Sequence, residues 1–284
     1  MDAVFITDYD IIAARIHPSA RSVIILSKQR TGKKLFELVE RDLTTQAIYK
    51  TFTLPSDLNK YQHSYNGSAG FLLYYAAGQD QLYLAYPTHY LAIWDYHEAT
   101  LLHNYSCRSG SLLFVNSLAV GPDGTLYFAS MGTPFISVIK PYHKDPKSIT
   151  IPPIKIKLSK KAYITDMTVH ETSNILFASA SDGMVHRYDP SSQTEFQPIT
   201  YESGGGGESK KKGLLSLNLK LGGKPKQKDF FCCMEFDPSW SYLIVGTSDG
   251  YLMCYNCKNV RPGQVHTFLE CTTRMSEHAV LSAK

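Results

Sequence analysis

The sequence predicts an all-β protein built from about five copies of one four-stranded antiparallel unit. The first observation is a hairpin that occurs twice: ASASDGMVHRYD at residues 178–189 returns as VGTSDGYLMCYN at residues 245–256. In both copies, β-branched and aromatic residues flank an Asp-Gly pair, which is typical of a tight turn whose two central residues have positive φ. The second observation is composition, because 19 Tyr and 13 Phe suit the faces of sheets.

The similarity extends to the residues before each hairpin. FVNSLAVGPDGTLYFAS at 114–130 aligns without a gap on YITDMTVHETSNILFAS at 163–179, and residues 230–247 follow the same pattern. Each copy is an alternating strand, a polar turn and a second strand, so the repeating unit is a strand meander. Fainter copies lie at 16–27 and 76–85. The equivalent positions in the five copies are Ile16, Ala76, Val120, Val169 and Phe236.

Third and fourth strands are expected after each pair, for example at 34–40 and 47–54, or at 91–95 and 100–106. The middle copies repeat at close to the roughly 40 to 45 residues of a four-stranded propeller blade. We therefore predict a β-propeller with about five recognisable blades. The fifth blade is expected to end with a strand at 265–271, after which residues 272–284 look like the start of a further blade.

These residues resemble the hairpin of the WD-repeat family. Asp182 and Asp249 stand at the family's turn aspartate, Tyr188 and Tyr255 stand at its tryptophan, and Trp94 with Asp95 is a literal WD dipeptide. No Gly-His dipeptide occurs, so the family's internal network of His, Ser or Thr, Trp and Asp is incomplete. The resemblance implies a non-catalytic scaffold for protein–protein interaction, as a subunit of a multiprotein complex.

Ring closure has several solutions. Five blades are compatible with a closed ring, with an open ring that a partner's strand completes, or with part of a longer protein. Of these, an open or incomplete ring of six or seven blades is favoured. Residues 4–7 are a candidate strand that completes the terminal blade or belongs to a missing one, since propellers protect their sheet edges in this way. Trp94 is expected to pack between neighbouring blades.

One domain is expected over residues 1–284, because all-β domains of this length are commonly single. No apolar run approaches the roughly 20 residues that cross a bilayer. The N-terminal residues MDAVFITDYD are acidic and lack a basic region followed by an apolar core. We expect an intracellular, cytoplasmic protein without a membrane span, with the nucleus as the other compartment.

A Gly/Lys-rich insertion at 203–228 separates the fourth and fifth blades, and it is expected to be flexible. Within it, Leu215, Leu217, Leu219 and Leu221 alternate with polar residues, as in a strand. The insertion either adds a strand to this propeller, offers an edge to a partner protein, or is a loop without a role. Its lysines allow weak attraction to anionic surfaces, but no aromatic residue lies among them to stack on bases, so there is no strong nucleic-acid signal.

In the WD-repeat family, the loops that join second to third strands line one face together with the loops between blades. The resemblance places the candidate interaction face at Arg30, Lys33, His89, Tyr90, Phe135, Asp182 and Asp249. The two aspartates either contact partners or stabilise their turns. The basic run KQRTGKK at 28–34 is interpreted as a solvated hairpin tip, with a phosphate or an acidic partner as the alternative.

Enzymatic alternatives are weaker. Residues 116–128 resemble a strand and turn of gluconolactonase-like propellers. These propellers are metal-dependent lactonases or hydrolases that bind a divalent cation. Asn116 and Asp166 are one step apart in the repeat alignment, so they are not expected to face one channel together. The segment 41–57 resembles a strand-to-strand segment of the secreted Yellow and royal-jelly family, but no signal segment is visible. We predict no cofactor, no metal and no catalytic residues.

Histidines and cysteines receive structural interpretations. His170 and His186 are predicted to be turn or surface residues. Cys254 and Cys257 form a C-x-x-C pair near Cys232 and Cys233, which is compatible with a metal or redox site. Adjacent strand residues point to opposite faces, so buried free thiols are the favoured interpretation for all six cysteines.

Overall fold

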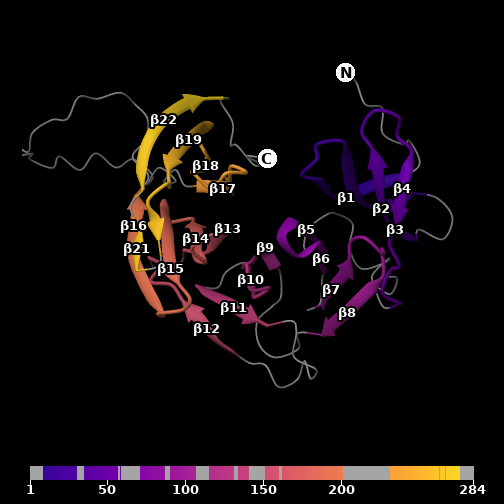
Figure 1. The fold of residues 1–284 in the computed structure, drawn as a ribbon, viewed down its shortest axis with the longest axis horizontal. Helices are drawn as coiled ribbons and strands as arrows, with labels where there is room; N and C mark the ends of the chain where they lie inside the picture. The colour runs from indigo at the N-terminus through magenta and orange to yellow at the C-terminus, as the bar shows by residue number, and fades with distance from the viewer. Residues whose placement is uncertain are drawn as a thin grey trace, which may run out of the picture. The chain divides into compact units, whose positions relative to one another are not determined.

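The structure is a computed structural model of the 284-residue chain. It describes residues 9–30, 35–56, 58, 71–86, 90–106, 115–130, 134–140, 151–159, 162–200, 231–261, 263–265 and 267–275. The chain divides into two compact units, Met1–Lys157 and Leu158–Lys284, and each is described by itself (Figure 1). The expected terminal strand at 4–7 and the insertion at 203–228 lie outside the described residues.

The first unit contains three four-stranded antiparallel sheets, each with its strands in chain order (Figure 1). The first sheet comprises β1 (Tyr9–Ile16), β2 (Ser22–Gln29), β3 (Phe36–Asp42) and β4 (Ile48–Thr51). The second comprises β5 (Leu72–Ala76), β6 (Gln81–Tyr86), β7 (Tyr90–Asp95) and β8 (Leu101–Ser106), with a short 3-10 helix, η2 (Ala77–Gln79). The third comprises β9 (Val115–Val120), β10 (Leu126–Ser130), β11 (Phe135–Ile139) and β12 (Ile151–Lys155). The first strands β1, β5 and β9 are neighbours in that order.

The second unit contains two further sheets of the same kind. The fourth sheet comprises β13 (Ile164–His170), β14 (Ile175–Ala180), β15 (Met184–Asp189) and β16 (Thr194–Thr200). The fifth comprises β17 (Phe231–Phe236), β18 (Tyr242–Thr247), β19 (Tyr251–Asn256) and β22 (Phe268–Arg274). A two-stranded hairpin of β20 (Val260–Arg261) and β21 (Gln264–Val265) precedes β22. The five predicted meanders are therefore confirmed as five four-stranded sheets.

The last strand differs from the expected one. It runs over Phe268–Arg274 rather than 265–271, so residues 272–274 belong to the fifth sheet instead of starting a further blade. The cause is the β20–β21 hairpin, which turns at Gly263 with a positive φ of 75°. That hairpin uses the apolar Val260 and Val265, and Val265 had been assigned to the outer strand.

The turns between first and second strands require a left-handed residue in all five sheets. These residues are Ala20, Asp80, Gly124, Asn174 and Trp240, with φ between 49° and 76°. Only one of them is glycine, although non-glycine residues rarely adopt this region. The turn is closed by backbone hydrogen bonds such as Trp240 N–H to Asp237 O at 2.9 Å. The polar turns were predicted, whereas the need for a positive φ at this position was not.

The Asp-Gly hairpins are looser than predicted. Ala180 pairs with Met184, which leaves a loop of Ser181, Asp182 and Gly183 in place of a two-residue turn. Only the glycine has a positive φ, 80° in this loop, and Gly250 has 88° in the equivalent one. The aspartate therefore keeps ordinary backbone angles, and its carboxylate is free to accept hydrogen bonds.

The residue that ends the third strand caps the following turn in four sheets. Asp42 Oδ1 accepts the N–H groups of Thr44 and Thr45, at 2.7 and 2.6 Å. Asp95, Asp189 and Asn256 accept backbone N–H groups in the same way. The aspartate of the WD dipeptide is thus a turn-capping residue, which is a role that Asp and Asn side chains commonly have.

The core lies between adjacent sheets. Trp94 is fully buried against the first sheet, in a cluster with residues such as Ile24, Leu38 and Leu82, and its Nε1–H donates to Thr53 O at 2.7 Å. The prediction that Trp94 packs between neighbouring blades is therefore confirmed. A corresponding cluster joins the fourth and fifth sheets through Ile175, Phe177, Val185, Phe231, Met234, Leu243, Val245 and Met253.

Candidate functional site

We call the end of a sheet at which its second strand connects to its third the hairpin end. Arg30 directly follows β2, Phe135 begins β11, and Asp182 and Asp249 lie between the second and third strands of their sheets. Tyr90 is the first residue of β7. Each of these candidate interaction residues therefore lies at the hairpin end of its own sheet. The other candidates, Lys33, His89, Leu215, Leu217, Leu219 and Leu221, lie outside the described residues.

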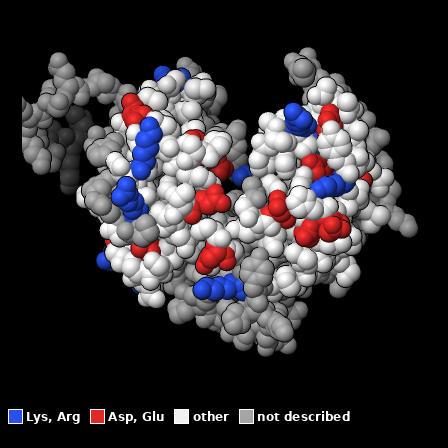
Figure 2. All heavy atoms as spheres, viewed as in Figure 1, with Lys and Arg blue, Asp and Glu red and all other residues white. Residues whose placement is uncertain are grey.

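Two of the candidate residues project into solvent. The Arg30 side chain is 55% exposed and its Nε lies 2.7 Å from Asp10 Oδ1, which is equally exposed. An ion pair this open contributes little to stability, so the guanidinium can exchange partners at low cost. Phe135 is 39% exposed, and the Nζ of Lys155 lies 6.0 Å from its ring centroid. Figure 2 shows acidic and basic side chains mixed on the face in view.

The two turn aspartates have contacts within the chain. Asp182 Oδ1 accepts the Met184 N–H and its Oδ2 accepts the Ser159 N–H, each at 3.2 Å, and the side chain is only 3% exposed. The hydroxyl of Thr247 donates to Asp249 Oδ1 at 2.6 Å. Of the two roles left open for these residues, the contacts favour turn stabilisation.

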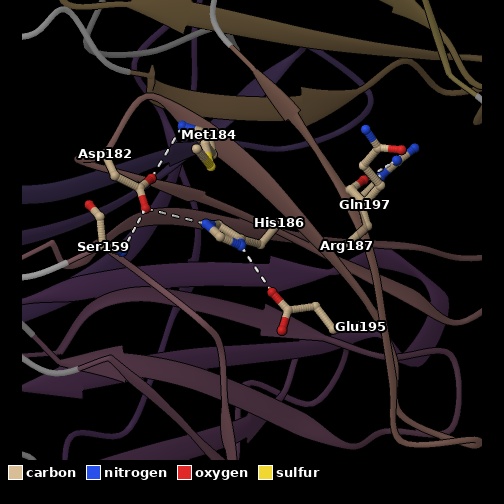
Figure 3. A network of polar contacts seen from close by, with 7 residues as sticks. All are labelled: Ser159, Asp182, Met184, His186, Arg187, Glu195 and Gln197. Carbon is tan, nitrogen blue, oxygen red and sulfur yellow. Dashed lines mark hydrogen bonds and ion pairs between the residues drawn. The ribbon is translucent and has the colours of Figure 1, made fainter.

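His186 is the centre of a buried charged network (Figure 3). Its Nδ1 lies 3.1 Å from Glu195 Oε1 and its Nε2 lies 3.6 Å from Asp182 Oδ2, while its side chain is 2% exposed. Burial opposes protonation of the imidazole, but the carboxylates of Asp182 and Glu195 outweigh it and raise the pKa of His186. Burial likewise opposes ionisation of Asp182, and hydrogen bonds from His186 and Ser159 nevertheless lower its pKa.

The prediction that His186 is a turn or surface residue is wrong. The strand register places it opposite a shift in the β15–β16 pairing, between Val185 and Arg187. Tyr188 pairs with Glu195, so His186, two residues before Tyr188, is a diagonal neighbour of Glu195 on the same face of the sheet. The imidazole faces Glu195 on β16 and the hairpin aspartate four residues before it. The spacing of Asp182 and His186 is visible in the sequence, but the contact with Glu195 depends on the pairing of β15 with β16.

Both ring nitrogens of His186 face acidic side chains. A general base needs a nitrogen lone pair that faces its substrate. Here both imidazole nitrogens face carboxylates, so the arrangement favours the doubly protonated ring. Its Nδ1–H donates to Glu195 Oε1 at 3.1 Å, and its Nε2 forms an ion pair with Asp182 Oδ2 at 3.6 Å. The imidazolium then joins the hairpin turn to the outer strand of the same sheet.

His170 is also buried, against prediction, because it packs on the next sheet. Its Nε2–H donates to Trp240 O at 2.8 Å, and its Nδ1 accepts from the Ser173 hydroxyl at 2.8 Å. Its ring meets Phe236 edge-on, with centroids 5.1 Å apart. Burial lowers the pKa of His170, so the neutral ring is favoured.

His17 occupies the repeat position of His170 and behaves similarly. It stacks on Tyr96 with centroids 5.2 Å apart and lies 5.1 Å from Tyr75, both in the second sheet. Tyr96 in turn donates to Glu40 of the first sheet at 2.7 Å. The sequence signal for this contact is the shared repeat position: His17 directly follows Ile16, and His170 directly follows the equivalent residue Val169.

The residues considered for a metal enzyme have other contacts. Asp166 accepts backbone N–H groups of Met167 and Met234 through its two carboxylate oxygens, both at 2.9 Å. Asn116 lies on β9, in the other unit. Within the part of the chain that the structure describes, no three His, Cys, Asp or Glu side chains are grouped so that they could hold a metal ion.

Five cysteines fall within the described ranges, and all are free thiols. Cys233 and Cys257 are buried, and burial raises the pKa of each to about 12. Cys257 follows β19 and its thiol donates to Tyr255 O, away from Cys254. Burial was predicted for all six, but Cys232 and Cys254 are only half-buried and Cys271 is exposed on the outer strand β22.

Among the described residues, no helix has the length and apolar character needed to cross a membrane.

Comparisons with known proteins identify the fold but not a sequence family. No protein-family model matches the chain, and no curated protein matches its sequence. The structure is similar to the β-propeller domain of Myceliophteria thermophila Cps50 (Swd1), with a TM-score of 0.60 and 12% sequence identity. The similarity covers 94% of this chain and 74% of that one. The five sheets are therefore blades of a β-propeller.

Proposed function

We propose that this chain is a non-catalytic protein–protein interaction scaffold, a WD-repeat-like propeller that acts as a subunit of a multiprotein complex. One observation carries the proposal. The polar side chains that end the strands are used in turns and between sheets, whereas Arg30 and Phe135 project from the hairpin ends of their sheets with 55% and 39% exposure. We infer that the exposed side chains at the hairpin ends of the sheets contact the partner.

A rigid arrangement of sheets and turns suits a scaffold. The loops are restricted before any partner binds. Their turns are capped by Asp42, Asp95 and Asp189, and buried hydrogen bonds from His170 and to Asp166 link neighbouring sheets. A preorganised surface loses less conformational entropy on binding, so more of the contact energy appears as affinity. Exposed Arg and aromatic side chains are also the residue types most often enriched at interfaces.

The case against catalysis rests on the same contacts. His186 has a carboxylate at each ring nitrogen and Asp166 has a backbone N–H at each oxygen. Groups with such partners serve a structural role. The propeller fold itself supports many functions, so its similarity to the Cps50 (Swd1) domain serves here as fold-level support alone.

The remaining contact residues belong to the proposal as well. Lys33, His89 and Tyr90 extend the interaction face, and Leu215, Leu217, Leu219 and Leu221 in the insertion 203–228 form a second, strand-like binding segment. We further propose that residues 1–284 act as one domain and that the protein works in the cytoplasm.

The experiment is affinity purification of the tagged chain from its native cells, followed by mass spectrometry and sizing. The test variant is Arg30→Ala with Phe135→Ala. The matched control is Arg261→Ala with Leu102→Ala, an exposed cation and an exposed apolar residue away from the hairpin ends. A partner set that the control retains and the test variant loses would support the proposal. Recovery of the unaltered chain as a bare monomer would refute it.

A further inference from the structure

Two cysteines of the fifth sheet face each other across neighbouring strands. Cys254 on β19 and Cys271 on β22 are directly paired residues of the antiparallel ladder. Directly opposed residues place their side chains on the same face of a sheet, with Cβ atoms about 4.5–5.5 Å apart. Cys271 is exposed and Cys254 is half-buried, so the pair is open to solvent on one side.

The ladder fixes the distance between them. Met275 N–H donates to Gly250 O at 2.8 Å, beside the paired residues Tyr251 and Arg274. Hydrogen-bonded and non-hydrogen-bonded pairs alternate along the strands, so Cys254 and Cys271 form a hydrogen-bonded pair, for which a regular ladder spaces the Cα atoms about 5.5 Å apart. This separation is the most common one in protein disulfides, about 5.5 to 6 Å. The pairing register shifts directly after this pair, between Cys254 and Tyr255.

The two thiols already interact. Burial raises the pKa of Cys254, and the neighbouring Cys271 raises it further by charge repulsion. The other cysteine combinations of this sheet lack such a geometry. Cys232 and Cys233 are adjacent on β17 and so point to opposite faces, and Cys257 is buried with its thiol directed at Tyr255 O.

We propose that Cys254 and Cys271 form a reversible cross-strand disulfide in the presence of a low-molecular-weight disulfide such as oxidised glutathione. The exposed Cys271 thiolate attacks one glutathione sulfur, which forms a mixed disulfide and releases one glutathione thiol. The Cys254 thiolate then attacks the Cys271 sulfur and releases the second. Two protein thiols are oxidised and one glutathione disulfide is reduced to two thiols, so atoms and electrons balance.

The bond would lock the edge of the sheet. The strand order is β17, β18, β19, β22, so among the described strands β22 pairs only with β19. Edge strands are the part of a sheet that can separate and pair with another chain. A disulfide would tie β22 to β19 and close the segment that contains the β20–β21 hairpin, which reduces the freedom of the unfolded chain. Oxidation therefore controls how firmly this edge is held.

The test uses the purified full chain, incubated with oxidised glutathione, alkylated and analysed by intact mass and peptide mapping. We expect a product lighter than the reduced chain by two hydrogen atoms, with the peptides of Cys254 and Cys271 linked. Its melting temperature should exceed that of the reduced chain, and dithiothreitol should reverse both changes. Formation of the link should accelerate as the pH rises, because the raised pKa of Cys254 limits its thiolate.

Variants separate this inference from ordinary thiol oxidation. Cys254→Ser should stop at a glutathione adduct on Cys271, and Cys271→Ser should form no link at Cys254. Cys232→Ser, a control in the same sheet, should form the link normally. A stable glutathione adduct on Cys271 in the unaltered chain, or a link from either cysteine to another one, would overturn the proposal. The measurements on the unaltered chain decide the matter even where a variant folds poorly.

Discussion

The carboxylate of Asp166 on β13 accepts the backbone N–H of Met234 on β17 at 2.9 Å. One side chain thereby joins the first strands of two adjacent sheets. Its other oxygen accepts the N–H of Met167 at 2.9 Å. The polar residue on this inner strand is therefore a link between sheets, which gives it a structural reason to be acidic.

Replacement of Asp166 by Ala should lower the free energy of unfolding by about 1–3 kcal/mol, because two backbone N–H groups lose their acceptor. Urea unfolding would measure the loss. Asp10→Ala is the matched control, since its carboxylate forms an exposed pair with Arg30 and its loss should cost less than about 1 kcal/mol. Equal stability of the two variants would contradict the linking role.

Replacement of Trp94 by Ala should lower the free energy of unfolding by about 3–5 kcal/mol, as for other large buried side chains. Trp94→Phe should lower the free energy of unfolding by less. It keeps a buried ring, and its cost is mainly the lost hydrogen bond to Thr53 O. Thermal unfolding of both variants would test the order. An unchanged melting temperature for the Ala variant would show that the ring is not a core element.

The stabilisation from His186 should fade as the pH rises. Its pKa in the folded chain is raised above the ordinary value of 6.5, so the folded state binds the proton more tightly than the unfolded state. The contribution is therefore complete below about pH 6.5 and is lost as the pH passes the folded-state pKa. We expect the difference in unfolding free energy between the unaltered chain and His186→Gln to shrink over that range. A constant difference would exclude the buried imidazolium.

His170 should show the opposite dependence. Its pKa in the folded chain is lowered below 6.5 by burial, so the unfolded state binds the proton more tightly. Its stabilising contribution is complete above about pH 6.5 and falls as the pH drops through the lowered folded-state pKa. The stability difference from His170→Phe should grow with pH up to about 6.5 and then level off. If it followed the trend of His186, the neutral hydrogen-bonded ring would be ruled out.

The strand content and the repeat could be read from the sequence, because alternation and turn chemistry are local properties. The Asp-Gly pairs, the polar turns and the spacing of the copies led to five four-stranded sheets, and the hairpin ends follow from the same alignment. Trp94 was identified as a core residue for the same reason: it lies on a strand whose apolar residues needed a neighbouring sheet.

Contacts between strands depended on the tertiary structure. His186 meets Glu195 because β15 and β16 pair with Tyr188 opposite Glu195, and Cys254 meets Cys271 because the β20–β21 hairpin displaces the last strand to Phe268–Arg274. His170 is buried because Phe236 and Trp240 of the next sheet enclose it. The sequence by itself determined where the strands form, since each strand and turn depends on neighbouring residues. The partners of individual side chains were decided only by the tertiary structure, because a single inserted residue or short hairpin changes which residues of two strands stand opposite each other.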